Sequence, residues 1–135
     1  MTPVCSASCQ RRPIGAGLPA WRLERVLGYI EANLAAPIGL PQLADAAGLS
    51  MNYFSAQFQI ATGCRPHAYV RRRRIDRAQR MLLEGRLSLI EIALSVGFQS
   101  HAHFTTVFRR AVGEAPGRWR QRSRAERGAL ARLSA

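Results

Sequence analysis

The chain has 135 residues, 47% of them hydrophobic, which suits one domain with tails and a modest core. Twenty arginines and no lysine stand against eight acidic residues, for a formal net charge of +12. This excess points to a polyanionic partner, with nucleic acid first; the alternative is a charge bias that only keeps the protein soluble.

The cysteines and the N-terminal segment indicate the cellular compartment in which the protein is expected. Three cysteines, two of them in the first ten residues, make no disulfide framework, so a reducing cytosol is expected. No apolar run approaches the roughly 18 residues of a membrane span. Residues 1–20 are rich in Pro, Gly and Ser and lack the apolar stretch of a secretory signal, so they are predicted to be a disordered leader. We expect a cytoplasmic, nucleoid-associated protein without membrane contact.

An internal repeat dominates the rest of the sequence. Segment 43–69 recurs as segment 92–119, with Phe-x-x-x-Phe beginning at Phe54 and again at Phe104. Chance similarity of two amphipathic helices does not explain why both copies continue into Gly-x-x-Pro-x-x-aromatic. The two segments are therefore interpreted as a duplication of one helix-turn-helix unit.

In chain order, apolar spacing predicts about seven helices and no strand, an all-α domain over residues 21–122. A covering helix over 21–34 precedes a first helix-turn-helix at about 39–63, whose second helix is Met51–Thr62. A long linker helix, 66–85, leads to a second unit at about 88–113, whose second helix is His101–Val112. A last helix opens at Pro116, and the basic tail 123–135 either extends it or frays.

Local signals support these boundaries. Ser88 to Glu91 has the form of a capping box, Gly97 is suited to a left-handed turn, and Ser100 is a plausible N-cap. Pro66 and Pro116 are placed to open helices. In the linker helix the expected core stripe is Ala68, Ile75, Ala78 and Leu82, flanked by Tyr69 and Met81.

The second helix of each unit buries one stripe, and the opposite side is the candidate reading face. At 100° per residue, Ala102, Thr106 and Arg109 lie opposite Phe104 and Phe108, with His101 and Thr105 at the margins. The same geometry in the first unit selects Asn52, Ala56 and Gln59, with Ser55 at the margin.

The residues now resemble a known family. "IALSVGFQSHAHFTTVFRRAVGEAPGRWR" follows the I-A-x-x-x-G-F, F-x-x-x-F and G-x-x-P-x-x-aromatic-R pattern of the DNA-binding domain of AraC/XylS bacterial transcription regulators. The resemblance covers about 100 of the 135 residues. It implies sequence-specific binding of double-stranded DNA in two successive major grooves, usually to activate transcription through RNA polymerase. The family's base-contacting positions match Asn52, Ser55, Ala56, His101, Ala102, Thr105 and Thr106.

One departure from the family concerns the bases that are read. Family members often carry arginine where this chain has Ala56 and Thr106, so bidentate recognition of guanine is lost at both positions. Alanine and threonine methyls suit thymine methyl groups, while Asn52 or Gln59 suits adenine. The hypothesis is that phosphates supply affinity, and that methyl contacts, amides and DNA shape supply specificity.

Arginines supply the candidate phosphate contacts. A helix distributes the run 71–74 around its axis, so about two of the four face one DNA backbone and the others are solvated or paired with Asp76 and Glu84. Arg74, at the family's usual arginine position, is a candidate for a structural role. The phosphate candidates are Arg71, Arg72, Arg109, Arg110 and Arg118.

The expected DNA site follows from two different readers in one chain. Reading positions about one helical turn, roughly 34 Å, apart predict an asymmetric site of about 20 base pairs that a monomer occupies. Most family members also carry a ligand-sensing domain. No small-molecule site is expected in this chain, which resembles the stand-alone members or is a fragment of a longer regulator.

Rival functions find little support. His101 and His103 point about 200° apart on a helix, which is poor geometry for a shared metal. Cys5 and Cys9 have ligand-like spacing but need a second cysteine pair, and only Cys64 remains. We expect no catalysis, metal or cofactor. A basic helical protein-interaction module stays open as an alternative, and the target genes, any effector and the sign of regulation stay undetermined.

Overall fold

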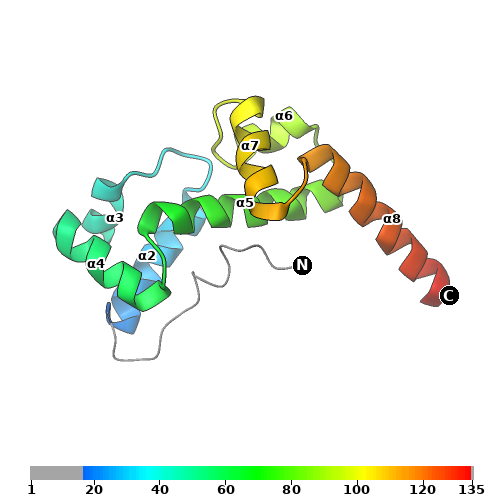
Figure 1. Cartoon of the computed structure of the whole chain (residues 1–135). Coiled ribbons are helices and arrows are strands. Elements are labelled where there is room, and N and C mark those ends of the chain that lie inside the picture. The colour runs from blue at the N-terminus through cyan, green and yellow to red at the C-terminus, as the bar shows by residue number, and fades with distance from the viewer. Residues whose placement is uncertain (1–16, 135) are drawn as a thin grey trace. The chain divides into compact units, whose positions relative to one another are not determined.

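The computed structural model describes residues 17–134, which form seven helices and no strand (Figure 1). This confirms the predicted all-α fold with two helix-turn-helix units. The helices are α2 (Ala20–Ala32), α3 (Leu40–Ala47), α4 (Met51–Thr62), α5 (Pro66–Glu84), α6 (Leu89–Ser95), α7 (His101–Val112) and α8 (Pro116–Ser134). They divide into two compact units, one ending at Arg74 and one beginning at Ile75, both within α5.

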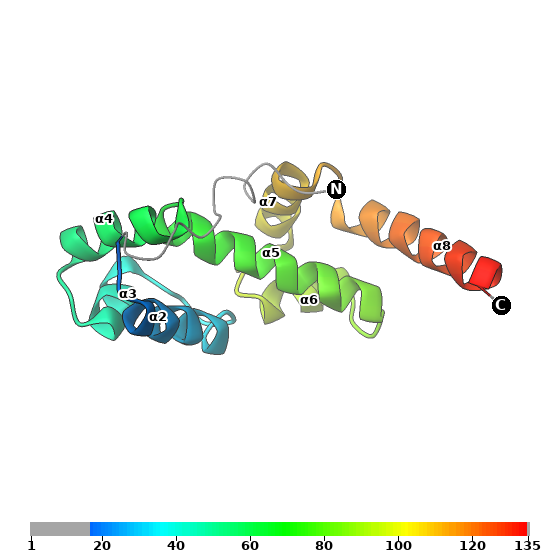
Figure 2. The same cartoon turned by 90° about the horizontal axis from the view of Figure 1, so that it is seen from below.

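In the first unit α2 packs against α3, and α3 packs against α4 (Figure 2). The covering helix buries Leu23, Val26 and Ile30 and leaves Leu27 half-buried. Leu18 also enters this core at 7% exposure, although the sequence placed it in the leader. Residues 1–16 of that leader lie outside the described residues.

Helix α4, the candidate reading helix of this unit, is anchored by aromatic rings. Phe54 and Phe58 are fully buried, and their ring centroids lie 5.5 Å apart. Tyr69 of α5 meets Phe58 edge-on, also at 5.5 Å. In this first part of α5 the expected stripe differs by one residue: Ala68 is half-buried, and Val70 is buried instead. Val70 has the larger apolar surface, so burying it removes more of that surface from water.

The second unit repeats this arrangement around a core of its own. Ile75, Ala78 and Leu82 of α5 are fully buried, as predicted. Phe104 and Phe108 lie 5.7 Å apart, and Trp119 of α8 meets Phe108 edge-on at 5.9 Å, the place that Tyr69 takes in the first unit. The paired aromatics that revealed the repeat therefore hold both reading helices.

Turns and caps fix where α7 begins and ends. Gly97, in the turn before it, has φ 92°, and Gly113, after its last residue, has φ 103°. Residues other than glycine rarely adopt this left-handed backbone conformation, so both positions favour glycine. The Ser100 hydroxyl accepts a hydrogen bond from the His103 amide at 3.1 Å, and Ser50 caps α4 in the same way. Both predicted roles, the turn at Gly97 and the cap at Ser100, are confirmed.

Two arginines of α5 hold the first unit together. Arg74 donates hydrogen bonds to Leu34 O at 3.1 Å and Ala36 O at 2.8 Å, in the segment after α2. Burial lowers the pKa of Arg74 through desolvation. Arg73 forms a two-point ion pair with Glu31, with distances of 2.7 and 3.1 Å. The structural role predicted for Arg74 is confirmed.

Cys64, in the turn between α4 and α5, is buried. Its amide donates to the hydroxyl of Thr62, which in turn donates to Phe58 O at 2.9 Å. Cys5 and Cys9 lie outside the described residues.

The tail that the sequence left open is helical, because α8 continues to Ser134. Near its start, Arg122 pairs with Glu114 and with Glu126, the latter an i,i+4 pair at 2.8 Å. Arg120 donates to Leu87 O at 3.1 Å, which joins α8 to the segment before α6.

Candidate nucleic-acid interface

The outer side of α4 is polar and uncharged. Asn52, Ala56 and Gln59 are exposed, and Ser55 is half-buried, so helical geometry placed all four as the structure does. The sequence of the helix, MNYFSAQFQIAT, contains no ionisable group except the Tyr53 phenol. This face offers amides and a methyl group to a partner.

The outer side of α7 combines small side chains with positive charge. His101, Ala102 and Thr106 are exposed along one side, and Arg109 and Arg110 occupy the last turn. Thr106 Oγ1 donates to Ala102 O at 3.0 Å, which ties its hydroxyl to the helix backbone. Thr105 is half-buried, and its hydroxyl is shielded from solvent without a hydrogen-bond partner among the described residues. The Thr105 hydroxyl is therefore not accessible to a partner.

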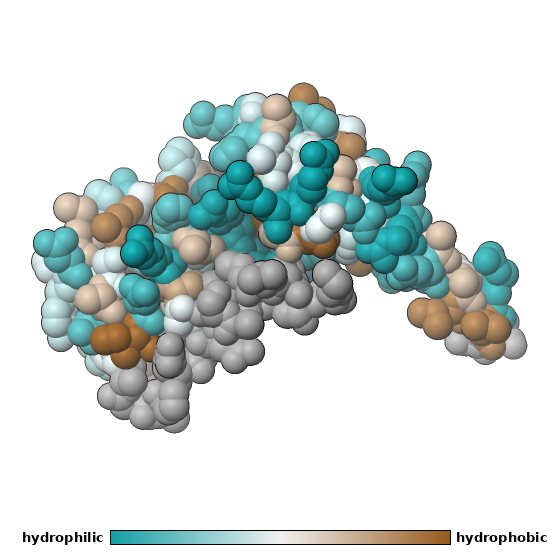
Figure 3. All heavy atoms as spheres, in the orientation of Figure 1, coloured by the Kyte–Doolittle hydropathy of each residue, from teal (hydrophilic) through white to brown (hydrophobic). Residues whose placement is uncertain are grey.

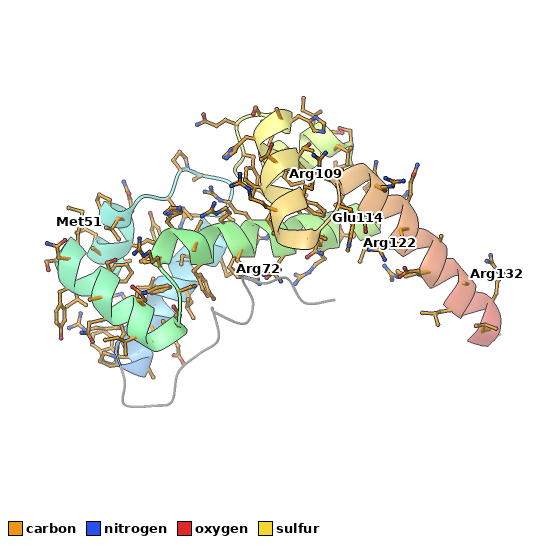
Figure 4. All side chains as sticks on the ribbon, in the orientation of Figure 1. Met51, Arg72, Arg109, Glu114, Arg122 and Arg132 are labelled. Carbon is orange, nitrogen blue, oxygen red and sulfur yellow. The ribbon has the colours of Figure 1, made fainter. Side chains whose placement is uncertain are left out.

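The two arginines at the end of α7 are free to meet an anion. Neither Arg109 nor Arg110 makes a hydrogen bond or ion pair within the described residues, and both are exposed. Arg122 contrasts with them, because Glu114 and Glu126 compensate it and raise its pKa through hydrogen bonds. Figure 4 shows Arg109 on α7 and the Glu114–Arg122 pair at the start of α8.

The surface around these residues is strongly polar. Figure 3 shows mostly hydrophilic side chains over α7 and the first turns of α8, while hydrophobic side chains gather at the far end of α8. Leu133, in that last part, is 83% exposed. Arg118, in the first turn of α8, is exposed and has no hydrogen-bond partner among the described residues.

The arginines of α5 divide by role. Arg71 is exposed and lies 3.2 Å from the His67 ring nitrogen. Arg72 is half-buried and already engaged in an interaction. Because Arg73 and Arg74 serve the fold, Arg71 is the member of the run with the most accessible charge.

The two neighbouring histidines of α7 occupy separate positions. His101 is the exposed first residue of α7, whereas the ring of His103 packs edge-on against Phe98 with centroids 5.4 Å apart. Within the part of the chain described, no three His, Cys, Asp or Glu side chains group as metal ligands. None of the described helices is long and apolar enough to cross a membrane.

Sequence reasoning missed two surface features. Ile90 and Leu94, one turn apart on α6, are each 55% exposed, and their i,i+4 spacing was the signal in the sequence. An open groove of about 510 Å³ also lies between α2 and α3. Its lining is Arg25, Tyr29, Gln42, Asp45 and Ala46.

Comparison with known proteins places the fold in a recognised group. Residues 43–122 match the family model described as "Helix-turn-helix domain". The crystal structure of the DNA-binding domain of AdpA in complex with a target DNA is similar, with a TM-score of 0.74, 31% identity and coverage of 79% of this chain and 96% of that one. A probable AraC family transcriptional regulator from Rhodopseudomonas palustris gives a TM-score of 0.67, with 33% identity and coverage of 78% and 99%.

Curated relatives are longer than the matched region. The transcriptional activator RhaR of Klebsiella pneumoniae is 36% identical over 103 residues, which are 76% of this chain and 37% of the relative. The probable transcriptional regulator LumQ of Photobacterium leiognathi is 37% identical over 100 residues, 73% of this chain and 40% of the relative. The chain thus aligns with less than half the length of each of these relatives.

Proposed function

The chain belongs to the AraC-type helix-turn-helix family, and from that membership we propose that it regulates transcription by binding specific sequences of double-stranded DNA. In this proposal α4 and α7 enter successive major grooves, the docking mode of helix-turn-helix proteins. The base-reading residues are Asn52, Ser55, Ala56 and Gln59 on α4 and His101, Ala102, Thr105 and Thr106 on α7. The phosphate contacts are Arg71, Arg72, Arg109, Arg110 and Arg118.

The observation that carries the proposal is the outer face of α7. Two exposed arginines, without partners among the described residues, stand in the last turn of a helix whose opposite side buries Phe104 and Phe108. Two neighbouring positive charges without an anion repel each other, and DNA phosphates supply the anions that neutralise them. Contacts between these phosphates and the two arginines orient the small residues of the same face toward the edges of the bases.

The relatives extend the proposal to regulation. RhaR is named a transcriptional activator, and we propose that this chain also activates, through contact with RNA polymerase in the cytoplasm. The two reading faces differ, with amides on α4 and methyl groups and arginines on α7. Different readers require an asymmetric site of about 20 base pairs, which one monomer fills.

Salt dependence tests the phosphate contacts. For a duplex selected by this chain from random sequences, the logarithm of the binding constant should fall linearly with the logarithm of the salt concentration. The Arg109→Ala variant should reduce that slope by about one, because one phosphate contact is lost. Fluorescence anisotropy from low to high salt measures both quantities.

The matched control is Arg122→Ala, which removes an equal charge that Glu114 and Glu126 already compensate. Its salt slope should stay within error of the parent protein. Equal slopes for all three proteins contradict the proposed contact, and binding without salt dependence contradicts a DNA-binding function.

A further inference from the structure

The two threonine hydroxyls of α7 are restricted in what they can offer a partner. The Thr106 hydroxyl donates to Ala102 O at 3.0 Å, and the Thr105 hydroxyl is buried. A free threonine hydroxyl can donate to a base or accept from one. Because the Thr106 proton is engaged within the helix, the side chain has no proton to donate to a base and keeps its methyl group and its acceptor lone pairs. The exposed Ala102, one turn earlier, adds a second methyl group.

We infer that α7 recognises the C5-methyl group of pyrimidines, so that it accepts thymine and 5-methylcytosine alike and disfavours cytosine. The inference rests on the proposed function and specifies the ligand of its second reading helix. It makes DNA binding by this chain sensitive to cytosine methylation within the site.

The chemistry of the major groove supports this assignment. The C5-methyl group of thymine is the apolar group that a base pair displays there. 5-Methylcytosine carries the same methyl, although it presents an amino donor where thymine has a carbonyl acceptor. The Thr106 hydroxyl can still accept a hydrogen bond from that amino group, so the difference does not exclude 5-methylcytosine. The imidazole and guanidinium groups of α7, on His101, His103, Arg109 and Arg110, stand in its first and last turns.

The first reading helix has a different character. Its exposed face places the amides of Asn52 and Gln59 on either side of Ala56. Amides pair with the donor and acceptor of adenine. Dependence on pyrimidine methyl groups should therefore be strongest in the part of the site that α7 contacts.

Single-atom changes in the DNA test the inference. A preferred site is first selected from random duplexes with the intact chain, and each thymine in it is then replaced by deoxyuridine. Removing a contacted methyl should weaken binding about fourfold, the effect of exposing one methyl-sized apolar group. At that position 5-methylcytosine should bind about fourfold more tightly than cytosine.

Two substitutions of Thr106 separate its methyl from its hydroxyl. Thr106→Val keeps a methyl and loses the hydroxyl, and should still distinguish thymine from deoxyuridine. Thr106→Ser keeps the hydroxyl and should lose that distinction. Thr106 is exposed, so neither change should alter the thermal unfolding of the protein.

The possible outcomes distinguish a failure of this inference from a failure of the proposed function. A chain that selects no sequence overturns both. A chain that selects a site yet binds thymine and deoxyuridine forms equally overturns the inference alone. So does a deoxyuridine effect that persists in Thr106→Ser, because it then arises from DNA shape instead of this methyl.

Discussion

At the scale of single residues, the arginines of this chain have three different roles. Arg74 donates to two backbone carbonyls, Arg73 and Arg122 neutralise carboxylates, and Arg109 has no partner among the residues that the structure describes. Composition alone reports a net charge of +12 and cannot separate these roles. The separation depends on which acceptor lies within reach after folding, such as Leu34 O, which is 40 positions away in the chain.

Arg74 provides a stability prediction at this scale. The Arg74→Ala variant should lower the free energy of unfolding by about 1–3 kcal/mol, because two carbonyls in the segment after α2 lose charged donors. Urea unfolding followed by circular dichroism measures the change. Arg80→Ala, an exposed site on the same helix, is the control and should stay within about 0.5 kcal/mol. Equal effects at both sites contradict a structural role for Arg74.

At the scale of elements, the sequence predicted what depends on local chemistry. The starts and ends of α4 and α7 match because serine caps, glycine turns and the Phe-x-x-x-Phe stripe act over a few residues. The burial of Val70 in place of Ala68, and of Leu18 from the expected leader, depends on contacts between distant segments. Helical geometry also placed Thr105 and Thr106 near the reading face, but it does not specify the rotamers that turn their hydroxyls away.

The capping box of α6 makes an element-scale prediction about pH. Glu91 accepts a hydrogen bond from the Ser88 amide at 3.0 Å, and that bond lowers the pKa of the carboxyl below its ordinary value of 4.5. A lowered folded-state pKa means that the stabilisation is present above pH 4.5 and is lost as pH falls through the folded value. Thermal unfolding should therefore show Glu91→Gln less stable than the parent near neutral pH.

Comparing Glu91→Gln with the parent protein at lower pH checks the direction in which stability changes with pH. The difference in melting temperature between Glu91→Gln and the parent should shrink steadily once the pH drops below 4.5. Ser88→Ala breaks the other half of the box and should lower the melting temperature throughout. A Glu91→Gln difference that is independent of pH argues that the charge of the carboxylate contributes nothing to the cap.

At the scale of the whole molecule, two units with separate cores carry two unlike candidate reading faces. The duplication explains why the units share a fold, and the divergence of their outer residues explains why they are proposed to read different bases. The repeat was visible in the sequence because core aromatics and turn glycines are constrained in both copies. The identity of the bases was not, because exposed residues take their meaning from a partner outside the chain.

Binding-site selection with reading-helix variants tests the central claim most directly. Preferred sequences are determined for the parent chain, for Asn52→Ala on α4 and for Thr106→Asn on α7. The account predicts that each variant changes base preference in its own block, with the blocks about one helical turn apart and overall affinity little altered. A uniform loss of affinity across all sequences, or both variants altering the same block, would contradict it.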